Sequence, residues 1–316
     1  MKNIVNILTI LIISVFCSTN SEILIMVPVF NRPDFIEIQY KTFKKFLKDK
    51  DYKIIMFNDA NNDSMEQKIK EVCATYGITC IRVPQTVHDV KHHLRKDSEA
   101  SFRHGEVMQF AFENYGFKHN DVVMLIDSDV FLIHEFSIRE YLGDNDMFGI
   151  FQNCLVPQLC FLNMPKLDNP QSLNFRAGHA PWNENNLHDA GCFTDKYIVS
   201  HPKLKLKKLN PIWGLFRKYP ISLNLDDDKD MTPQLTERGY TELEINLIES
   251  IFKVCKDSAK TDPNSIAKIS FDIDIGFYET NIFLDYWHGS AWHNPSNKTL
   301  AIKDKLIKDF ISSILK

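Results

Sequence analysis

The sequence predicts an α/β fold built on a mostly parallel, doubly wound sheet. In the first half of the chain, four apolar runs of strand type alternate with segments of helical periodicity. Such alternation calls for parallel strands joined by right-handed crossovers. The chain has 316 residues, of which 44% are hydrophobic and 12% aromatic. It can therefore bury a large core, and an intrinsically disordered chain is excluded.

The first strand and helix are expected at the start of this pattern. Residues 23–30 form a nearly continuous apolar run that is closed by Asn31 and Arg32. Pro33 suits the first turn of the helix that follows. The apolar stripe of that helix recurs at spacings of four, three and four residues, and consists of Ile36, Tyr40, Phe43 and Leu47. This periodicity is that of an amphipathic helix.

The second and third strands repeat the plan. A strand is expected at residues 52–57, followed by a polar stretch that contains Asp59 and by a second helix. A third strand is expected at residues 78–83. A His-rich stretch then leads to Ser98, which suits the cap of a helix that ends before Gly116.

The fourth strand, at residues 122–126, ends in two acids one residue apart, Asp127 and Asp129. Side chains two positions apart in a strand point the same way, so both carboxylates project together where the strand leaves the sheet. Two like charges at that distance repel unless a proton or a cation lies between them. A hard divalent cation is the usual partner of such a pair. An acid-rich turn without a ligand is the alternative explanation.

Polar residues follow several of these strands directly. In a parallel sheet the strands end on one edge, where ligands bind in the crevice. The polar residues expected at that edge are Asn31, Arg32, Asp59, Asp127 and Asp129. The early turns of the helix that runs back from it contain Arg103 and His104. The sequence therefore predicts one crevice that collects all of these side chains.

The second half of the chain has a looser pattern. Helix signals return at residues 241–254 and 300–315, and strand signals at residues 269–286. No linker or internal repeat separates the halves. We therefore expect a single domain over residues 22–316, in which residues 136–316 elaborate the sheet of residues 22–135.

The N-terminus has the composition of a secretory signal peptide. A short apolar segment is followed by small and polar residues that end near residue 21. The apolar segment is short for a membrane span, which needs about 20 residues, although a short membrane anchor remains the alternative. The prediction is an exported or secretory-pathway protein, with membrane association only through residues 1–21.

Cysteine content and charge add two constraints. Without the leader, six cysteines remain. Two pairs are close enough in sequence to form disulfides in an oxidising compartment: Cys73 with Cys80, and Cys154 with Cys160. Buried free thiols explain these cysteines equally well. The net charge of -4 and pI near 6.3 give no basic surface. Nucleic acid is therefore not an expected partner.

Three motifs resemble those of nucleotide-diphospho-sugar transferases of the GT-A glycosyltransferase fold. They are residues 26–32 of the first strand, residues 57–59 of the second, and residues 125–131, which look like the DxD motif of that family. Residues 286–292, which include His288, resemble a late loop that some of these enzymes use for a further metal ligand.

The resemblance implies a metal-dependent glycosyltransferase with a GT-A fold. It implies a divalent metal, Mn or Mg, held by Asp129, Asp127 and His288, and a UDP- or GDP-sugar as donor. The residues that would bind the nucleotide are, by the same resemblance, Val27, Asn31, Arg32, Asp59, Arg103 and Asp127. Asp59 departs from the pattern, since Ala60 and two Asn residues replace the Gly-Ser more often seen.

The acceptor side is expected in the loop-rich second half. Asp189, beside Ala190 and Gly191, resembles the acceptor-facing loop of the family and would act as the catalytic base or bind the acceptor, which could be a glycan, a lipid or a protein. A turn cap is the alternative role for Asp189. Two other functions compete with sugar transfer: a phosphatase-like hydrolase with an Asp-x-Asp site, and a non-catalytic exported sugar-binding protein.

Overall fold

The computed structural model describes residues 22–88, 99–151, 154–179, 187–212, 232–261, 275–279, 281–286 and 298–316. The expected leader and His288 therefore lie outside the described residues, as do His92 and His93 of the His-rich stretch. In the part of the chain that is described, no helix is both long and apolar enough to cross a membrane.

The central sheet has seven strands in the order β10-β6-β7-β4-β1-β2-β3. Its strands are β1 (Ile23–Val29), β2 (Tyr52–Asn58), β3 (Thr79–Arg82), β4 (Val122–Ile126), β6 (Met147–Phe151), β7 (Leu155–Asn163) and β10 (Leu206–Lys208). β7 runs antiparallel to β4 and β6, and the other neighbours pair in parallel. The mostly parallel α/β sheet predicted from the sequence is confirmed.

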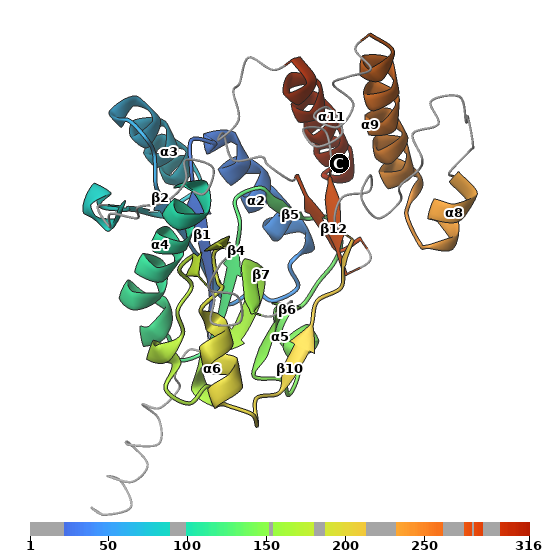
Figure 1. The fold of residues 1–316 in the computed structure, drawn as a ribbon. Helices are drawn as coiled ribbons and strands as arrows, with labels where there is room; N and C mark the ends of the chain where they lie inside the picture. The colour runs from blue at the N-terminus through green and yellow to red at the C-terminus, as the bar shows by residue number, and fades with distance from the viewer. Residues whose placement is uncertain are drawn as a thin grey trace, which may run out of the picture.

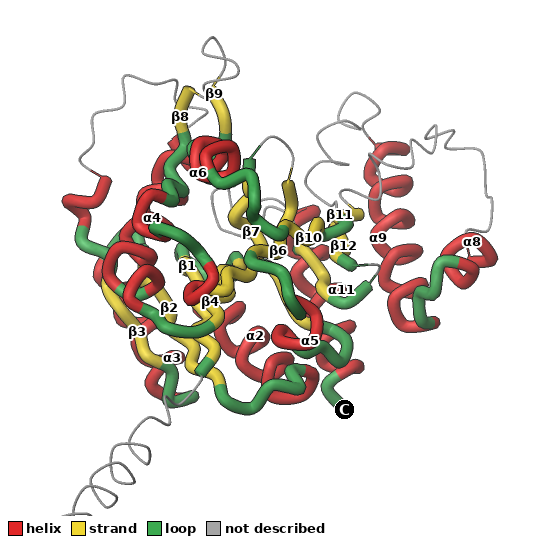
Figure 2. The backbone as a smooth tube through the Cα atoms, turned by 90° about the horizontal axis from the view of Figure 1, so that it is seen from below, coloured by secondary structure: helices red, strands yellow, loops and turns green. Residues whose placement is uncertain are grey.

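Both faces of this sheet are covered by helices, which explains why β1 is apolar at every position. One face packs Ile25 and Val27 against α2 (Pro33–Phe46) and α3 (Asp63–Thr75), and the other packs Met26 against α4 (Glu99–Asn114). Figure 2 shows the strands between α4 on one side and α2 and α3 on the other. Side chains alternate between the faces because successive strand residues point in opposite directions.

A second, antiparallel sheet has the order β11-β12-β13-β5. Its strands are β11 (Pro211–Ile212), β12 (Gly276–Tyr278), β13 (Phe283–Asp285) and β5 (Val130–Leu132). It packs against α9 (Glu242–Thr261) and α11 (Lys298–Ile314), which lie together away from α3 and α4 in Figure 1. Because β5 follows β4 after three residues, the two sheets meet at the turn that carries Asp127 and Asp129.

Short elements complete the described structure. They are the helices α5 (Ile138–Leu142), α6 (Thr194–Ser200) and α8 (Thr232–Glu237), the strands β8 (Gly178–His179) and β9 (Leu187–His188), and the 3-10 turns Gln85–His88, Gly116–Lys118, Met164–Lys166 and Pro170–Ser172. Five cysteines are described as free thiols: Cys73, Cys80, Cys154, Cys160 and Cys192.

Candidate functional site

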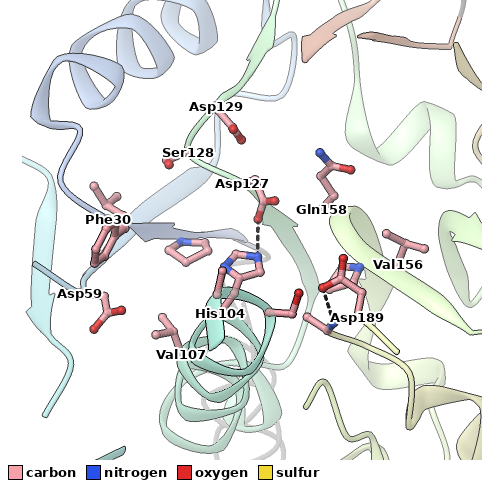
Figure 3. Close-up of a pocket in the computed structure, with 16 residues that line it drawn as sticks. Phe30, Asp59, His104, Val107, Asp127, Ser128, Asp129, Val156, Gln158 and Asp189 are labelled. Carbon is pink, nitrogen blue, oxygen red and sulfur yellow. Dashed lines mark hydrogen bonds and ion pairs between the residues drawn. The ribbon is translucent and has the colours of Figure 1, made fainter. Parts of the chain in front are cut away.

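A cavity of about 280 Å³ opens at the carboxyl ends of β1, β2 and β4. Its wall combines Phe30 after β1, Asp59 after β2, His104 on α4, the turn of residues 127–129 and Gln158 on β7 (Figure 3). The crevice predicted from the strand order therefore exists. Asp59, His104, Asp127 and Asp129 line it together, and Asp189 lines it from the second half of the chain.

The turn that carries the two acids is held by backbone contacts. The Asp127 N–H donates to the Gln158 carbonyl at 3.0 Å, and the Val130 N–H donates to the Asp127 carbonyl at 3.2 Å. From α2, the buried Gln39 side chain donates through Nε2 to the carbonyls of Asp127 (2.7 Å) and Val130 (2.9 Å). These bonds fix the backbone of the turn independently of its carboxylates.

Asp127 forms an ion pair with His104 across the cavity. His104 Nε2 lies 3.0 Å from the buried Oδ1 of Asp127. Burial opposes a charge on His104, yet Asp127, with Asp189 and Asp129, outweighs it and raises the pKa of His104 to about 9. His104 is consequently protonated at neutral pH.

Asp59 is engaged by two basic side chains. Arg103 binds its carboxylate in a bidentate manner, with Nε 2.6 Å from Oδ2 and Nη2 2.7 Å from Oδ1. His88 Nε2 lies 2.8 Å from the same Oδ1. The Arg103 guanidinium also lies 5.2 Å from the centre of the Phe30 ring. Arg103 thus holds the carboxylate of the acid that follows β2.

Four of the expected nucleotide-binding residues stand outside the cavity wall: Arg103, described above, and Val27, Arg32 and Asn31. Val27 is fully buried in the core of the sheet. Arg32 lies 3.5 Å over the Phe35 ring and bonds to Asp34 and Asp304. Asn31 adopts a left-handed conformation with φ 51°, and its Oδ1 accepts a hydrogen bond from the Asn61 N–H at 3.2 Å.

Asp189 is exposed and lines the cavity after β9. Its Oδ1 accepts a hydrogen bond from the Ala190 N–H at 2.7 Å, so it also caps a turn. The turn is pressed against β7 at Gly191, where φ is +86° and an added Cβ would lie 2.3 Å from the Leu155 carbonyl oxygen. Only glycine fits there, and this close approach brings Asp189 to the cavity.

Sequence reasoning did not identify Gln158, which lines the cavity, or His88, which contacts the cavity residue Asp59. Gln158 reaches the cavity only because β7 pairs antiparallel with β4, which no local pattern reveals. His88 belongs to the His-rich stretch before Ser98, and in the structure it contacts Asp59. For both residues the informative fact is a long-range contact, and a single sequence carries no signal of it.

The residues present suit a hard divalent cation. Asp127 and Asp129 supply carboxylate oxygens on one wall, and oxygen ligands of this kind are the ones that such cations prefer. No cluster of three or more metal-binding side chains occurs within the described residues. Tyr286, which precedes His288 by two positions, donates its N–H to the Asp129 carbonyl at 2.9 Å.

No protein-family model and no curated protein sequence matches the chain. Among solved structures it is similar to glucosyl-3-phosphoglycerate synthase from Mycobacterium tuberculosis in complex with Mn²⁺, UDP and glucosyl-3-phosphoglycerate, at 13% identity over 60% of this chain and 69% of that chain with a TM-score of 0.37. It is also similar to the galactosyltransferase LgtC in complex with donor and acceptor sugar analogues, at 12% identity over 59% of this chain and 73% of that one with a TM-score of 0.35.

A third similar structure is core-mannan synthase A from Aspergillus fumigatus in its Mn/GDP form, at 12% identity over 43% of each chain with a TM-score of 0.30. Identities of 13% or less and TM-scores below 0.5 carry no information on the substrate or activity of this chain.

Proposed function

We propose that this chain is a metal-dependent glycosyltransferase that moves a sugar from a nucleotide-diphosphate donor to a glycan, lipid or protein acceptor. The observation that carries the proposal is the pair Asp127 and Asp129 at the end of β4, in one cavity with Asp59 and Asp189. Both acids belong to residues 125–131, the segment that resembles the DxD motif of sugar transferases.

The two acids would hold the metal, Mn or Mg, as oxygen ligands. When bound, a divalent cation neutralises charge on a donor diphosphate and favours its departure. We assign His288 as a further ligand, an assignment supported by the hydrogen bond between the Tyr286 N–H and the Asp129 carbonyl. Nitrogen from His suits Mn better than Mg.

The end of the cavity at Asp59 is assigned to the nucleotide. Arg103 and His88 hold the Asp59 carboxylate in place, and the Phe30 ring offers an apolar surface beside it. Arg103 is partly exposed, with 20% of its side chain accessible, so its guanidinium remains within reach of a ligand while it orients Asp59. Preorganised polar groups of this kind lose little freedom when a ligand binds.

Asp189 is assigned as the base that accepts the proton of the acceptor hydroxyl. Asp189 is exposed to the cavity and can approach an acceptor that enters from solvent.

Calorimetric titration of the protein with UDP and GDP, with and without Mn²⁺, tests the proposal. We expect one nucleotide to bind only with metal, and an Asp129→Ala variant to lose that binding. Asp309→Ala is the matched control, since it removes an acid from α11 that is 63% exposed and pairs with Lys305. Its nucleotide binding should equal that of the parent.

The other outcomes point to the competing functions. Binding of neither nucleotide under any metal would overturn the transferase assignment. Metal-dependent release of phosphate from a phosphate ester would then indicate the hydrolase, and binding of free sugar without turnover would indicate a sugar-binding protein. Retention of nucleotide binding in Asp129→Ala would exclude the assigned metal site.

A further inference from the structure

Gln158 lies in the same cavity as the two acids but comes from a different strand. Its backbone carbonyl accepts the hydrogen bond of the Asp127 N–H at 3.0 Å, so the two residues are neighbours across the β4–β7 pair. Its side chain lines the cavity wall. Figure 3 shows it across the cavity from Phe30 and Asp59.

The Gln158 amide is held from behind by a buried carboxylate. Gln158 Nε2 donates to Asp285 Oδ2 at 3.0 Å, and the Tyr278 hydroxyl donates to the same oxygen at 2.6 Å. Asp285 and Tyr278 are both fully buried. Burying a carboxylate costs free energy unless hydrogen-bond donors surround it. The bond from Gln158 Nε2 to Asp285 therefore constrains the Gln158 amide strongly.

The contact also decides which end of the amide faces the cavity. A glutamine amide has one donating end and one accepting end of nearly equal shape, which the hydrogen-bond network must distinguish. An ionised carboxylate only accepts hydrogen bonds, so the end of the amide that contacts Asp285 Oδ2 is the donating nitrogen. The carbonyl oxygen, Oε1, is left for the cavity, where it accepts no hydrogen bond from the described residues.

We propose that Gln158 Oε1 accepts a hydrogen bond from a hydroxyl of the donor sugar and thereby discriminates among nucleotide sugars. This inference rests on the proposed function and deepens it. With Asp59 assigned to the nucleotide and the 127–129 turn to the diphosphate, the Gln158 wall is the part of the cavity that remains for the sugar. A fixed neutral acceptor suits an uncharged hydroxyl, and a sugar that lacks or inverts that hydroxyl leaves the acceptor unpaired.

The test compares the affinity for nucleotide sugar with that for nucleotide alone. Gln158→Met keeps the length of the side chain and removes both polar ends. Calorimetric titrations with Mn²⁺ would use UDP, GDP, UDP-glucose, UDP-galactose, UDP-N-acetylglucosamine and GDP-mannose on the full chain. We expect the variant to bind the preferred nucleotide sugar about tenfold more weakly and the matching nucleotide within about twofold of the parent, the loss of one hydrogen bond.

Tyr278→Phe is the matched control. It removes the other hydrogen bond to the same Asp285 oxygen, at a fully buried position that does not line the cavity. We expect a loss of thermal stability comparable with that of Gln158→Met, but an unchanged ratio of nucleotide-sugar to nucleotide affinity. A changed ratio in this control would show that any loss of a hydrogen bond to Asp285 alters sugar binding. It would overturn the proposal that Gln158 Oε1 binds a sugar hydroxyl.

The failure of this inference is distinguishable from the failure of the proposed function. If the parent binds neither UDP nor GDP, the proposed function falls and the inference falls with it. If the parent binds nucleotide and Gln158→Met changes no affinity, only the inference is overturned. Equal weakening of nucleotide and nucleotide sugar in the variant overturns it as well, because Gln158 would then not read the sugar.

Discussion

Arg32 and Asp304 join the end of the first strand to the C-terminal helix, with Arg32 Nη2 3.0 Å from Asp304 Oδ1. The Arg32 guanidinium also lies 3.5 Å over the Phe35 ring, and the Tyr286 hydroxyl donates to the same Asp304 carboxylate. Tyr286 in turn bonds through its N–H to the Asp129 carbonyl. Arg32 is therefore connected to the 127–129 turn through α11 and β13 without lining the cavity.

This network predicts that Arg32 stabilises the fold. We expect Arg32→Met to lower the free energy of unfolding by about 2 kcal/mol, because Asp304 would lose a largely buried charge partner. Chemical denaturation would measure the loss. Arg139→Met is the matched control, since its pair with Asp121 involves an Arg side chain that is 38% exposed, compared with 14% for Arg32. A loss of nucleotide affinity in Arg32→Met at unchanged stability would instead favour the nucleotide-binding role implied by the resemblance.

The Asp34 carboxyl predicts how stability depends on pH. Burial opposes its ionisation, but Arg32 and Lys308 outweigh burial and lower its pKa from an ordinary value of 3.8 to about 2. A carboxyl with a lowered pKa stabilises the folded state above its ordinary pKa, and this contribution is lost as the pH falls toward 2. Asp34→Asn should cost about 1 kcal/mol at pH 6, allowing for a side chain that is 35% exposed, and only a small part of that near pH 2.

Denaturation curves of the parent and Asp34→Asn between pH 2 and about 6 measure this difference. Asp309→Asn serves as the control, because it changes an acid of α11 that is 63% exposed. Its effect should stay within about 0.5 kcal/mol throughout. A difference between parent and Asp34→Asn that is constant with pH would contradict the prediction.

Gln39 is predicted to hold the 127–129 turn in place. Gln39→Met removes the hydrogen bonds to the carbonyls of Asp127 and Val130, leaving both without this donor, and should cost about 2 kcal/mol of stability. Metal affinity should also fall, because the backbone that carries both acids is loosened. Titration with Mn²⁺ in the presence of the bound nucleotide measures that effect.

Gln109→Met provides the comparison for Gln39. Gln109 is also a buried glutamine, and its Oε1 accepts a hydrogen bond from the Phe175 N–H at 2.9 Å on the opposite face of the sheet. We expect a similar loss of stability and no change in Mn²⁺ affinity. Equal changes in metal affinity in both variants would show that general loosening, rather than the turn, is responsible.

Gly191 and Gly239 offer a paired test of the loop that presents Asp189. Both have a positive φ, +86° and +85°, but an added Cβ meets the Leu155 carbonyl oxygen at 2.3 Å only at Gly191, and nothing within 4 Å at Gly239. Gly239→Ala should cost about 1 kcal/mol from backbone strain alone. Gly191→Ala should cost at least about 3 kcal/mol, since β7 must move, and thermal unfolding would measure both. Equal losses of stability in the two variants would show that β7 moves away from the added Cβ of residue 191 at little cost in free energy.

The elements predicted from the sequence agree with the structure where a local pattern was strong. The apolar runs expected at residues 23–30, 52–57, 78–83 and 122–126 correspond to β1, β2, β3 and β4. The helix expected to begin at Pro33 is α2, which buries Ile36 and Phe43 as its stripe indicated. A strand buried on both faces has a continuous run of apolar residues, and a helix buried on one face has apolar residues at helical spacing. Both patterns can be recognised in the sequence without a structure.

The site was predictable to the extent that it follows from strand order. Asp59, Asp127 and Asp129 reach one cavity because parallel strands end on one edge, which the alternation of strands and helices already implies. Asp189 joins them through the packing of Gly191 on β7, and the sequence placed it there only by resemblance. The role of His288 stays a prediction, since it lies outside the described residues.

The sequence by itself determined the parallel half of the sheet, its helices and the acids at its edge, because periodicity and strand-end chemistry are local properties. Only the tertiary structure decided what the polar side chains contact. Arg32 bonds to Asp304 in α11, Arg103 to Asp59, and Gln158 to Asp285. Each of these contacts joins residues far apart in the chain, and the free energy of burying a charged or polar group depends on the partner that folding supplies.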